Sequence, residues 1–191
     1  MRLFVALEIP AAVRDNLAAL IKDLRNLSSR LADERPRWVR PENLHVTLKF
    51  IGEVAPGKLD GIRGVLSAIR SDAAVEMHFR GLGFFPDENE PRVLWAGLQA
   101  TPNLPSLAAD IDSALETQGI VREQRNFAAH LTLARFEPPG LHEKLRAAIQ
   151  QSGESEFGSF QAREFHLIES KLKPSGAAYT TLATFPFTKE E

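Results

Sequence analysis

Two four-residue segments, His45-Val46-Thr47-Leu48 and His130-Leu131-Thr132-Leu133, carry the side chains best suited to proton-transfer chemistry. An imidazole exchanges protons near neutral pH, and a threonine hydroxyl can donate a hydrogen bond to a developing negative charge. The pattern His-x-Thr-Leu occurs once in each half of a chain that has only five histidines, and the two copies are 85 residues apart. This recurrence predicts an internal duplication.

Alternation along a β-strand decides how each segment is displayed. His45 and Thr47 share one face of the expected strand, and the apolar residues between and after them share the other. With the apolar face on a core, the polar pair is exposed, and an approximate twofold relation between the halves places two imidazoles and two hydroxyls across a central cleft. Opposed histidines suit acid–base catalysis at a phosphodiester: one takes a proton from the attacking oxygen and the other gives one to the leaving oxygen.

Composition and charge limit the alternatives. The 191 residues are 43% hydrophobic with a net charge of −2, which is ordinary for a globular protein and too acidic for a coating mode of nucleic-acid binding. Yet each motif lies in a basic segment of net charge +2, residues 34–50 and 120–136. These basic segments could bind a negatively charged group of a substrate.

Cysteine is absent, so disulfides, thiol nucleophiles and thiolate metal sites are excluded. Two histidines without acidic residues at ligand spacing do not make a metal shell, and we expect no metal and no cofactor. The apolar run 3–7 is too short for a signal peptide or a membrane span, which predicts a soluble, cytoplasmic protein without membrane contact.

Apolar periodicity and turn residues predict an α+β fold, with the whole of residues 1–191 forming a single domain of two lobes. The expected strands cover residues 1–9, 44–51, 75–85, 92–98, 127–136, 164–172 and 177–187. Four helices are expected. The first follows Pro10, the second begins near Pro56, the third begins after Thr101 as its N-cap, and the fourth begins at Pro138-Pro139.

Taken together, these residues resemble the LigT-like branch of the 2H phosphoesterase superfamily, a family of RNA 2′,3′-cyclic phosphodiesterases once called 2′-5′ RNA ligases. The paired His-x-Thr-Leu motif is the specific part of the resemblance, which extends over essentially the whole chain. Supporting segments are Arg2-Leu3-Phe4-Val5-Ala6-Leu7, Trp38-Val39, Pro41-Glu42-Asn43-Leu44, Lys49-Phe50-Ile51-Gly52, Pro91-Arg92-Val93-Leu94-Trp95, Ala134-Arg135 and Glu169-Ser170.

The resemblance implies a pseudo-twofold fold of mainly antiparallel sheets facing a central cleft, with helices outside. It also implies metal-independent hydrolysis of an RNA-terminal 2′,3′-cyclic phosphate to a 2′-phosphate, and its reversal as 2′-5′ ligation. His45 is then the proton donor, His130 the proton acceptor, and Thr47 and Thr132 hold the phosphate. The implied partner is RNA with a cyclic phosphate end, tRNA fragments included, and we expect a monomer.

Four further residues are candidates for substrate binding. Arg135 suits a phosphate, although strict alternation turns it away from the motif histidine unless the strand bulges or twists after Thr132 or the side chain reaches around the edge. Lys49 shares the face of the first motif histidine by period two, or projects past the strand end. Phe50 is either core or a platform for a base, and the hydroxyl of Tyr179 could reach a phosphate or ribose.

Two other functions fit the same residues. The motif pair specifies the chemistry and not the leaving group, so a cyclic nucleotide or another 2′-linked phosphodiester is an alternative substrate. A non-catalytic module that binds RNA ends is the second alternative, although such a module has no need of two proton carriers. Among the remaining histidines, His78 and His142 are expected at the surface and His166 in a structural role.

Overall fold

The strands of the protein form two antiparallel sheets in a computed structural model that describes residues 1–31, 36–71, 73–137, 139–174 and 176–188. The first sheet has the order β3-β1-β8-β9, made of β1 (Arg2–Glu8), β3 (His45–Glu53), β8 (Glu164–Lys173) and β9 (Gly176–Pro186). The second has the order β2-β6-β5-β4-β7, made of β2 (Arg37–Trp38), β4 (Val75–Phe85), β5 (Val93–Ala100), β6 (His130–Arg135) and β7 (Glu156–Ala162).

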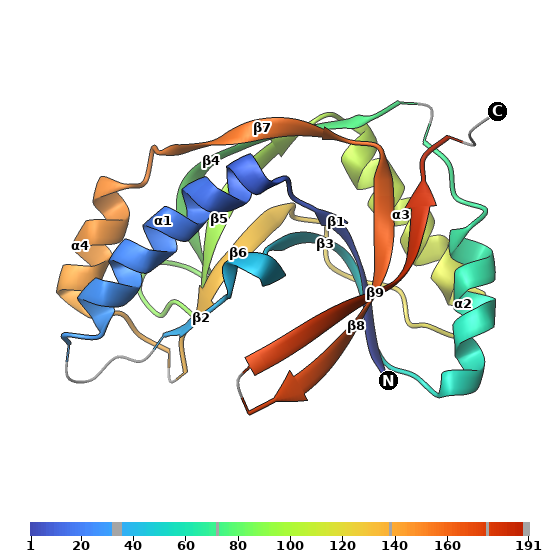
Figure 1. Cartoon of the computed structure of the whole chain (residues 1–191), viewed down its shortest axis with the longest axis horizontal. Helices are drawn as coiled ribbons and strands as arrows, with labels where there is room; N and C mark the ends of the chain where they lie inside the picture. Colours follow the sequence, from blue (N-terminus) through green and yellow to red (C-terminus); the bar gives the residue numbers. More distant parts are fainter. Residues whose placement is uncertain (32–35, 72, 138, 175, 189–191) are drawn as a thin grey trace.

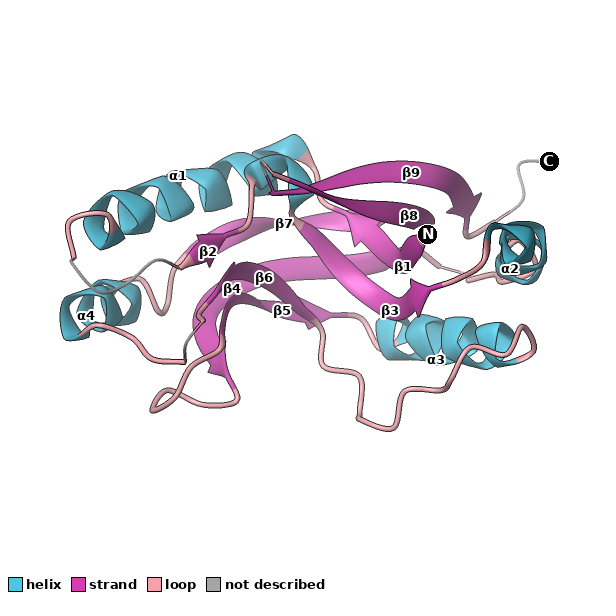
Figure 2. Ribbon diagram, turned by 90° about the horizontal axis from the view of Figure 1, so that it is seen from below, coloured by secondary structure: helices cyan, strands magenta, loops and turns pink. Residues whose placement is uncertain are grey.

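Helices lie at the two ends of the molecule, with the strands between them (Figures 1 and 2). One end has α1 (Ala11–Ser28) packed beside α4 (Glu143–Gln151), and the other has α2 (Leu59–Leu66) beside α3 (Asn103–Glu116). The 3-10 turns η1 (Pro41–Asn43) and η2 (Pro56–Lys58) precede β3 and α2. The predicted α+β class with two lobes is confirmed. No helix among the described residues is long and apolar enough to cross a membrane.

The two sheets repeat one arrangement: β3-β1-β8 in the first corresponds to β6-β5-β4 in the second. The chain crosses between them, since β4 joins the second sheet and β8 returns to the first. Helices cross as well: α1 follows β1 yet packs on β7, and α3 follows β5 yet packs on β3. One hydrophobic cluster therefore includes residues of both sheets.

Several expected boundaries were wrong. The strand β7 was not predicted, because Gly158 at φ +114° interrupts its alternation of apolar residues. Thr101 is not an N-cap: its hydroxyl donates to Asn103 Oδ1, at the start of α3. Helix α4 begins at Glu143, where the His142 ring accepts a hydrogen bond from the Lys144 amide. Pro138, half of the predicted start of that helix, lies outside the described residues.

Candidate active site

His45 and His130 occupy matched positions at the first residues of β3 and β6, two strands that contact each other at the junction of the sheets. The His45 Nδ1 atom lies 2.7 Å from the carbonyl oxygen of Asn43, and His130 Nδ1 lies 2.8 Å from that of Ala128. Because a carbonyl oxygen only accepts, each Nδ1 carries the hydrogen. In each neutral imidazole Nε2 is therefore the basic nitrogen.

The hydroxyl-bearing residues share the faces of their histidines. Thr47 and Thr132 are partly buried, whereas the residues that alternate with them face the core, as the sequence predicts. Thr47 lies opposite Ala6 of β1, and Thr132 lies opposite Trp95 of β5. The same register thus positions the threonine in both halves.

A β-bulge follows each motif and reverses the alternation of faces. Along β3, Thr47 pairs with Ala6 and Lys49 with Val5, so Leu48 is the extra residue. Along β6, Thr132 pairs with Trp95 and Ala134 with Leu94, so Leu133 is the extra residue. Two consecutive residues are buried after each threonine, and the next position returns to the face of the histidine.

Arg135 and Phe50 occupy this returning position in the second and first sheet. The bulge is the first of the routes expected for Arg135. The Arg135 guanidinium adds to the effect of burial in lowering the His45 pKa, and it opposes the effect of burial, which raises the Tyr179 pKa. Phe50 lies opposite Phe4 and has 59% of its surface exposed, so it is not a core residue. The duplicated motif thus places a cation on one side of the site and an aromatic ring on the other.

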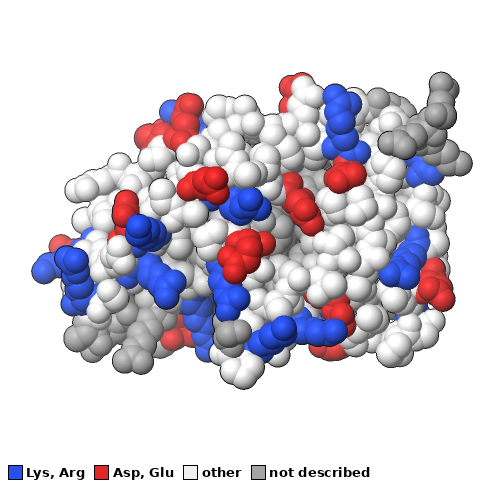
Figure 3. All heavy atoms as spheres, in the orientation of Figure 1, with Lys and Arg blue, Asp and Glu red and all other residues white. Residues whose placement is uncertain are grey.

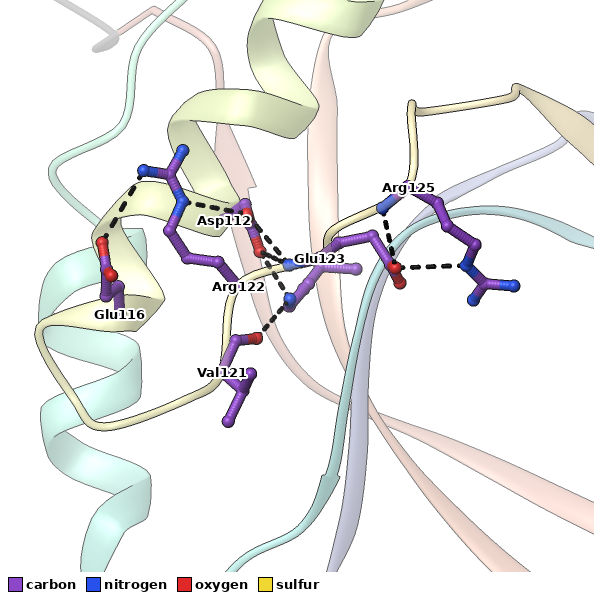
Figure 4. A network of polar contacts seen from close by, with 7 residues as sticks. Asp112, Glu116, Val121, Arg122, Glu123 and Arg125 are labelled. Carbon is purple, nitrogen blue, oxygen red and sulfur yellow. Dashed lines mark hydrogen bonds and ion pairs between the residues drawn. The ribbon is translucent and has the colours of Figure 1, made fainter.

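The prediction that Lys49 shares the face of His45 was wrong, because the bulge turns its side chain away from the site. Lys49 is buried, its Nζ lies 2.5 Å from Asp112 Oδ1 of α3, and it donates to the carbonyl oxygen of Val121 at 2.7 Å. Burial alone would raise the Asp112 pKa, but the hydrogen bonds from Lys49 and from the Glu123 amide outweigh it and lower that pKa. Lys49 therefore ties β3 to α3 and to the loop before β6. Figure 4 shows two of its partners, Asp112 of α3 and Val121 of that loop.

Replacing Lys49 tests this structural role. We expect Lys49→Met to lower the free energy of unfolding by up to about 3–5 kcal/mol, because Asp112 stays buried with Arg122 as its remaining cation. Urea unfolding measures the change. The double variant Lys49→Met/Asp112→Leu should lose less than the single one, since no unpaired carboxylate remains; a greater loss would contradict this account.

Aromatic rings pack against both histidines. Two of these rings, Phe4 and Phe85, were not predicted from the sequence as site residues. Phe4 lies 4.7 Å from the His45 ring, and Tyr179 lies 5.4 Å from it in an edge-to-face arrangement. Phe85 lies edge-to-face against His130 at 4.9 Å. The apolar second face of the first strand was the available signal for Phe4, whereas nothing in the sequence pairs Phe85 with His130.

Burial is the main cause that lowers the His45 pKa below its ordinary value of 6.5. The hydrogen bond to Asn43 opposes this effect, and the positive charges of Arg135 and of His130 when protonated add to it. The free protein consequently holds His45 neutral at pH 7. A phosphate placed beside the ring favours the imidazolium and raises that pKa.

NMR titration of the His45 ring tests this description. We expect a pKa below 6.5 in the free protein and a higher one in saturating inorganic phosphate, because the anion stabilises the imidazolium. Arg135→Gln should raise the pKa of free His45, since it removes one neighbouring positive charge. An unshifted His45 pKa in the free protein, or one that phosphate lowers, would contradict the assignment.

The remaining histidines lie elsewhere. His166 is 6% exposed and hydrogen-bonds Thr184 Oγ1 at 3.1 Å, and His78 lies 4.0 Å from the exposed Glu156. Residues 34 and 35 of the first basic segment lie outside the described residues. On the face shown in Figure 3, cationic and anionic side chains are interspersed, with no broad field of one sign among the residues described there.

The protein belongs to the LigT-like phosphoesterase family, whose pattern it matches over residues 7–95 and 98–179. It is 33% identical over 186 residues to the RNA 2′,3′-cyclic phosphodiesterase of Methanothermobacter thermautotrophicus, covering 97% of this chain and 98% of the relative. The enzyme of the same name from Archaeoglobus fulgidus is 34% identical over 185 residues, with coverage of 97% and 99%.

Solved structures agree with the fold. A crystal structure of a Thermus thermophilus protein superposes with a TM-score of 0.80 at 29% identity, covering 100% of both chains. Escherichia coli LigT in complex with 3′-AMP superposes with a TM-score of 0.74 at 27% identity, covering 98% of both. The mainly antiparallel pseudo-twofold architecture implied by the family resemblance is therefore confirmed.

Proposed function

We propose that this protein hydrolyses an RNA-terminal 2′,3′-cyclic phosphodiester to a 2′-phosphomonoester by acid–base catalysis between His45 and His130, without a metal or cofactor. The observation that carries the proposal is the matched tautomer of the two rings, each with Nδ1 hydrogen-bonded to a carbonyl two residues earlier. Both Nε2 atoms are thereby left to exchange protons. The names of the relatives support the substrate class.

Each histidine moves one proton. Neutral His130 takes a proton from water at Nε2 as the water oxygen bonds to phosphorus, and the bond from phosphorus to O3′ breaks. Protonated His45 gives its Nε2 proton to O3′, which leaves as a hydroxyl, while the phosphate stays on O2′. The hydroxyls of Thr47 and Thr132 donate to the non-bridging oxygens. The same ring opening with an RNA 5′-hydroxyl in place of water leaves its oxygen on phosphorus and gives 2′-5′ ligation.

The difference between the two halves supports this direction of proton transfer. An exposed aromatic ring, Phe50, lies on the side of His45, and Arg135 occupies the equivalent position in the other half. An RNA chain favours the aromatic side, because a base that precedes the terminal nucleotide can stack on an exposed ring. The O3′ atom belongs to the terminal nucleotide of that chain and leaves next to His45, and the water approaches from His130.

The lowered His45 pKa is compatible with a proton donor because the substrate supplies the missing charge. Burial lowers the pKa of the free ring, and an anion that enters the site favours the protonated donor. The guanidinium of Arg135 then interacts with the phosphate in place of the ring. His45 is thus charged chiefly in the complex in which its proton is used.

Recognition of the RNA end should give a shallow salt dependence. The net charge is −2, and charged side chains of both signs are mixed on the face in Figure 3, so we expect contact with only a few phosphates. The logarithm of the affinity should fall with the logarithm of salt concentration by about 0.7 per contacted phosphate. Binding measured over a salt series checks this, and a slope for about eight or more contacts would contradict end recognition.

The decisive experiment is a substrate panel assayed in EDTA. It compares RNAs ending in a 2′,3′-cyclic phosphate, 2′,3′-cyclic mononucleotides and the corresponding 3′,5′-cyclic compounds. We expect 2′-phosphate products from the first two groups and the same rates with and without EDTA. Loss of activity on chelation, with recovery on adding a divalent ion, would refute the metal-free mechanism, and binding of RNA ends without turnover would favour the non-catalytic alternative.

A further inference from the structure

A pocket of about 400 Å³ has Phe50 in its wall, and both charged and apolar side chains line it. It is formed by the end of β3, by η2 and by residues 119–123 of the loop between α3 and β6. Among the described residues, three large hydrophobic side chains are highly exposed, and two of them, Phe50 at 59% and Val121 at 81%, line this pocket. The third, Leu172 at 79%, lies on β8.

Two ring contacts connect the Phe50 wall of the pocket with His45. The Phe4 ring lies 4.7 Å from the His45 ring and 6.2 Å from the Phe50 ring. The bulge at Leu48 sets Phe50 on the face of His45, opposite Phe4. Phe50, in the wall of the pocket, is therefore two ring contacts away from His45.

Polar contacts hold the loop wall of the pocket in place. The carbonyl oxygen of Val121 accepts from buried Lys49, and the Glu123 amide donates to Asp112 at 3.2 Å (Figure 4). The Arg122 side chain pairs with the same Asp112 carboxylate at 3.4 Å. A wall fixed in this way keeps Val121 exposed without ligand, and a preformed pocket avoids the cost of ordering a loop on binding.

The charges around the pocket favour a neutral aromatic group over a phosphate. Lys58 and Arg122 are its exposed cations, and Glu53 and Glu123 are its anions. Lys58 donates to the Gln118 carbonyl oxygen, and Arg122 is paired with Asp112. The anions are engaged too, Glu53 with the Met1 amino group and Glu123 with Arg125. With the charges of both signs already paired, a base can pack on the exposed Phe50 and Val121 side chains.

We infer that this pocket binds the base of the nucleotide immediately 5′ of the terminal cyclic-phosphate nucleotide, with Phe50 as the stacking surface and Val121 on the opposite wall. The inference rests on the proposed function, which brings the terminal ribose to His45. The protein should therefore hydrolyse RNA chains in preference to cyclic mononucleotides, since a mononucleotide leaves the pocket empty.

The test compares kcat/KM for 2′,3′-cyclic AMP and for the dinucleotide ApA ending in a 2′,3′-cyclic phosphate. Stacking of one base on an aromatic side chain corresponds to about a five- to 150-fold effect, so we expect the wild type to prefer the dinucleotide by at least about tenfold. Phe50→Ala should reduce this preference about tenfold, mainly through the KM of the dinucleotide. Val121→Ser should reduce it by a smaller factor.

Leu172→Ser is the matched control, because it removes an equally exposed apolar side chain that does not line the pocket, and it should leave the preference unchanged. A wild type that hydrolyses both substrates with equal efficiency would overturn the inference alone. So would a Phe50→Ala variant that loses the same factor on both substrates, because Phe50 would then contact the terminal base. A wild type that hydrolyses neither substrate would refute the proposed function and this inference with it.

Discussion

His45→Ala and His130→Ala should each lower kcat on a cyclic-phosphate RNA by at least about 10²-fold, the usual contribution of a positioned acid or base. The double variant should be little slower than either single one, because donor and acceptor act in one proton-transfer sequence. The wild-type rate should rise and then fall as the pH increases, since one ring must be charged while the other is neutral. We expect the optimum between about pH 6 and 8. Each single variant should lose one limb of that profile.

The histidines off the site provide the control for these variants. His78→Ala removes an imidazole on β4 that lies 4.0 Å from the exposed Glu156, and this variant should keep the wild-type rate. Thermal unfolding should show that all four variants remain folded, because both motif histidines are only partly buried. A wild-type rate in either His45→Ala or His130→Ala would remove that residue from the mechanism.

Thr47→Ala and Thr132→Ala should lower kcat by up to about 10²–10³-fold, the effect of losing one well-aligned donor to a developing oxyanion. Both hydroxyls lie on strand positions fixed by pairing with Ala6 and Trp95, so the loss should appear in kcat with little change in stability. Steady-state kinetics on a cyclic-phosphate RNA measures the effect.

Thr117→Ala is the matched control for the threonines, since this exposed residue at the end of α3 hydrogen-bonds only the Ala114 carbonyl and the neighbouring Gln118 side chain among the described residues. It should retain wild-type kinetics. Thr→Ser at positions 47 and 132 should recover most of the rate, because serine keeps the donor. Full kcat in either alanine variant would show that its hydroxyl does not contact the phosphate in the transition state.

The motifs made the strands and their catalytic faces predictable, because alternation over His45 to Leu48 is regular. The prediction failed one residue later, at Lys49. Hydrophobic patterning does not mark a bulge when the extra residue is apolar at a position where alternation already predicts an apolar residue, as at Leu48 and Leu133. Two adjacent apolar residues, Leu133-Ala134, before a charged one were the only indication that alternation breaks in β6.

The hydrogen bonds that orient the two imidazoles could not be predicted from side-chain types. Both partners are backbone carbonyls, at Asn43 and Ala128, and every residue has one. The side chain of Asn43 contributes indirectly, since its Nδ2 donates to the Ala177 carbonyl oxygen at 2.8 Å and so ties the turn before β3 to β9. Such a contact over 134 residues arises from the crossing of the chain between sheets, which local patterns do not encode.

The position of β1 between β3 and β8 has a consequence for how the protein is made. One edge of β1 pairs with β8, and the whole second sheet is synthesised between these two strands. Contacts this distant in sequence form late, and the earlier part of a nascent chain must wait for them. The sheet that carries His45 is completed only after the ribosome has released β8 and β9, so translation products truncated before β8 have an open strand edge on β1 and lack Tyr179.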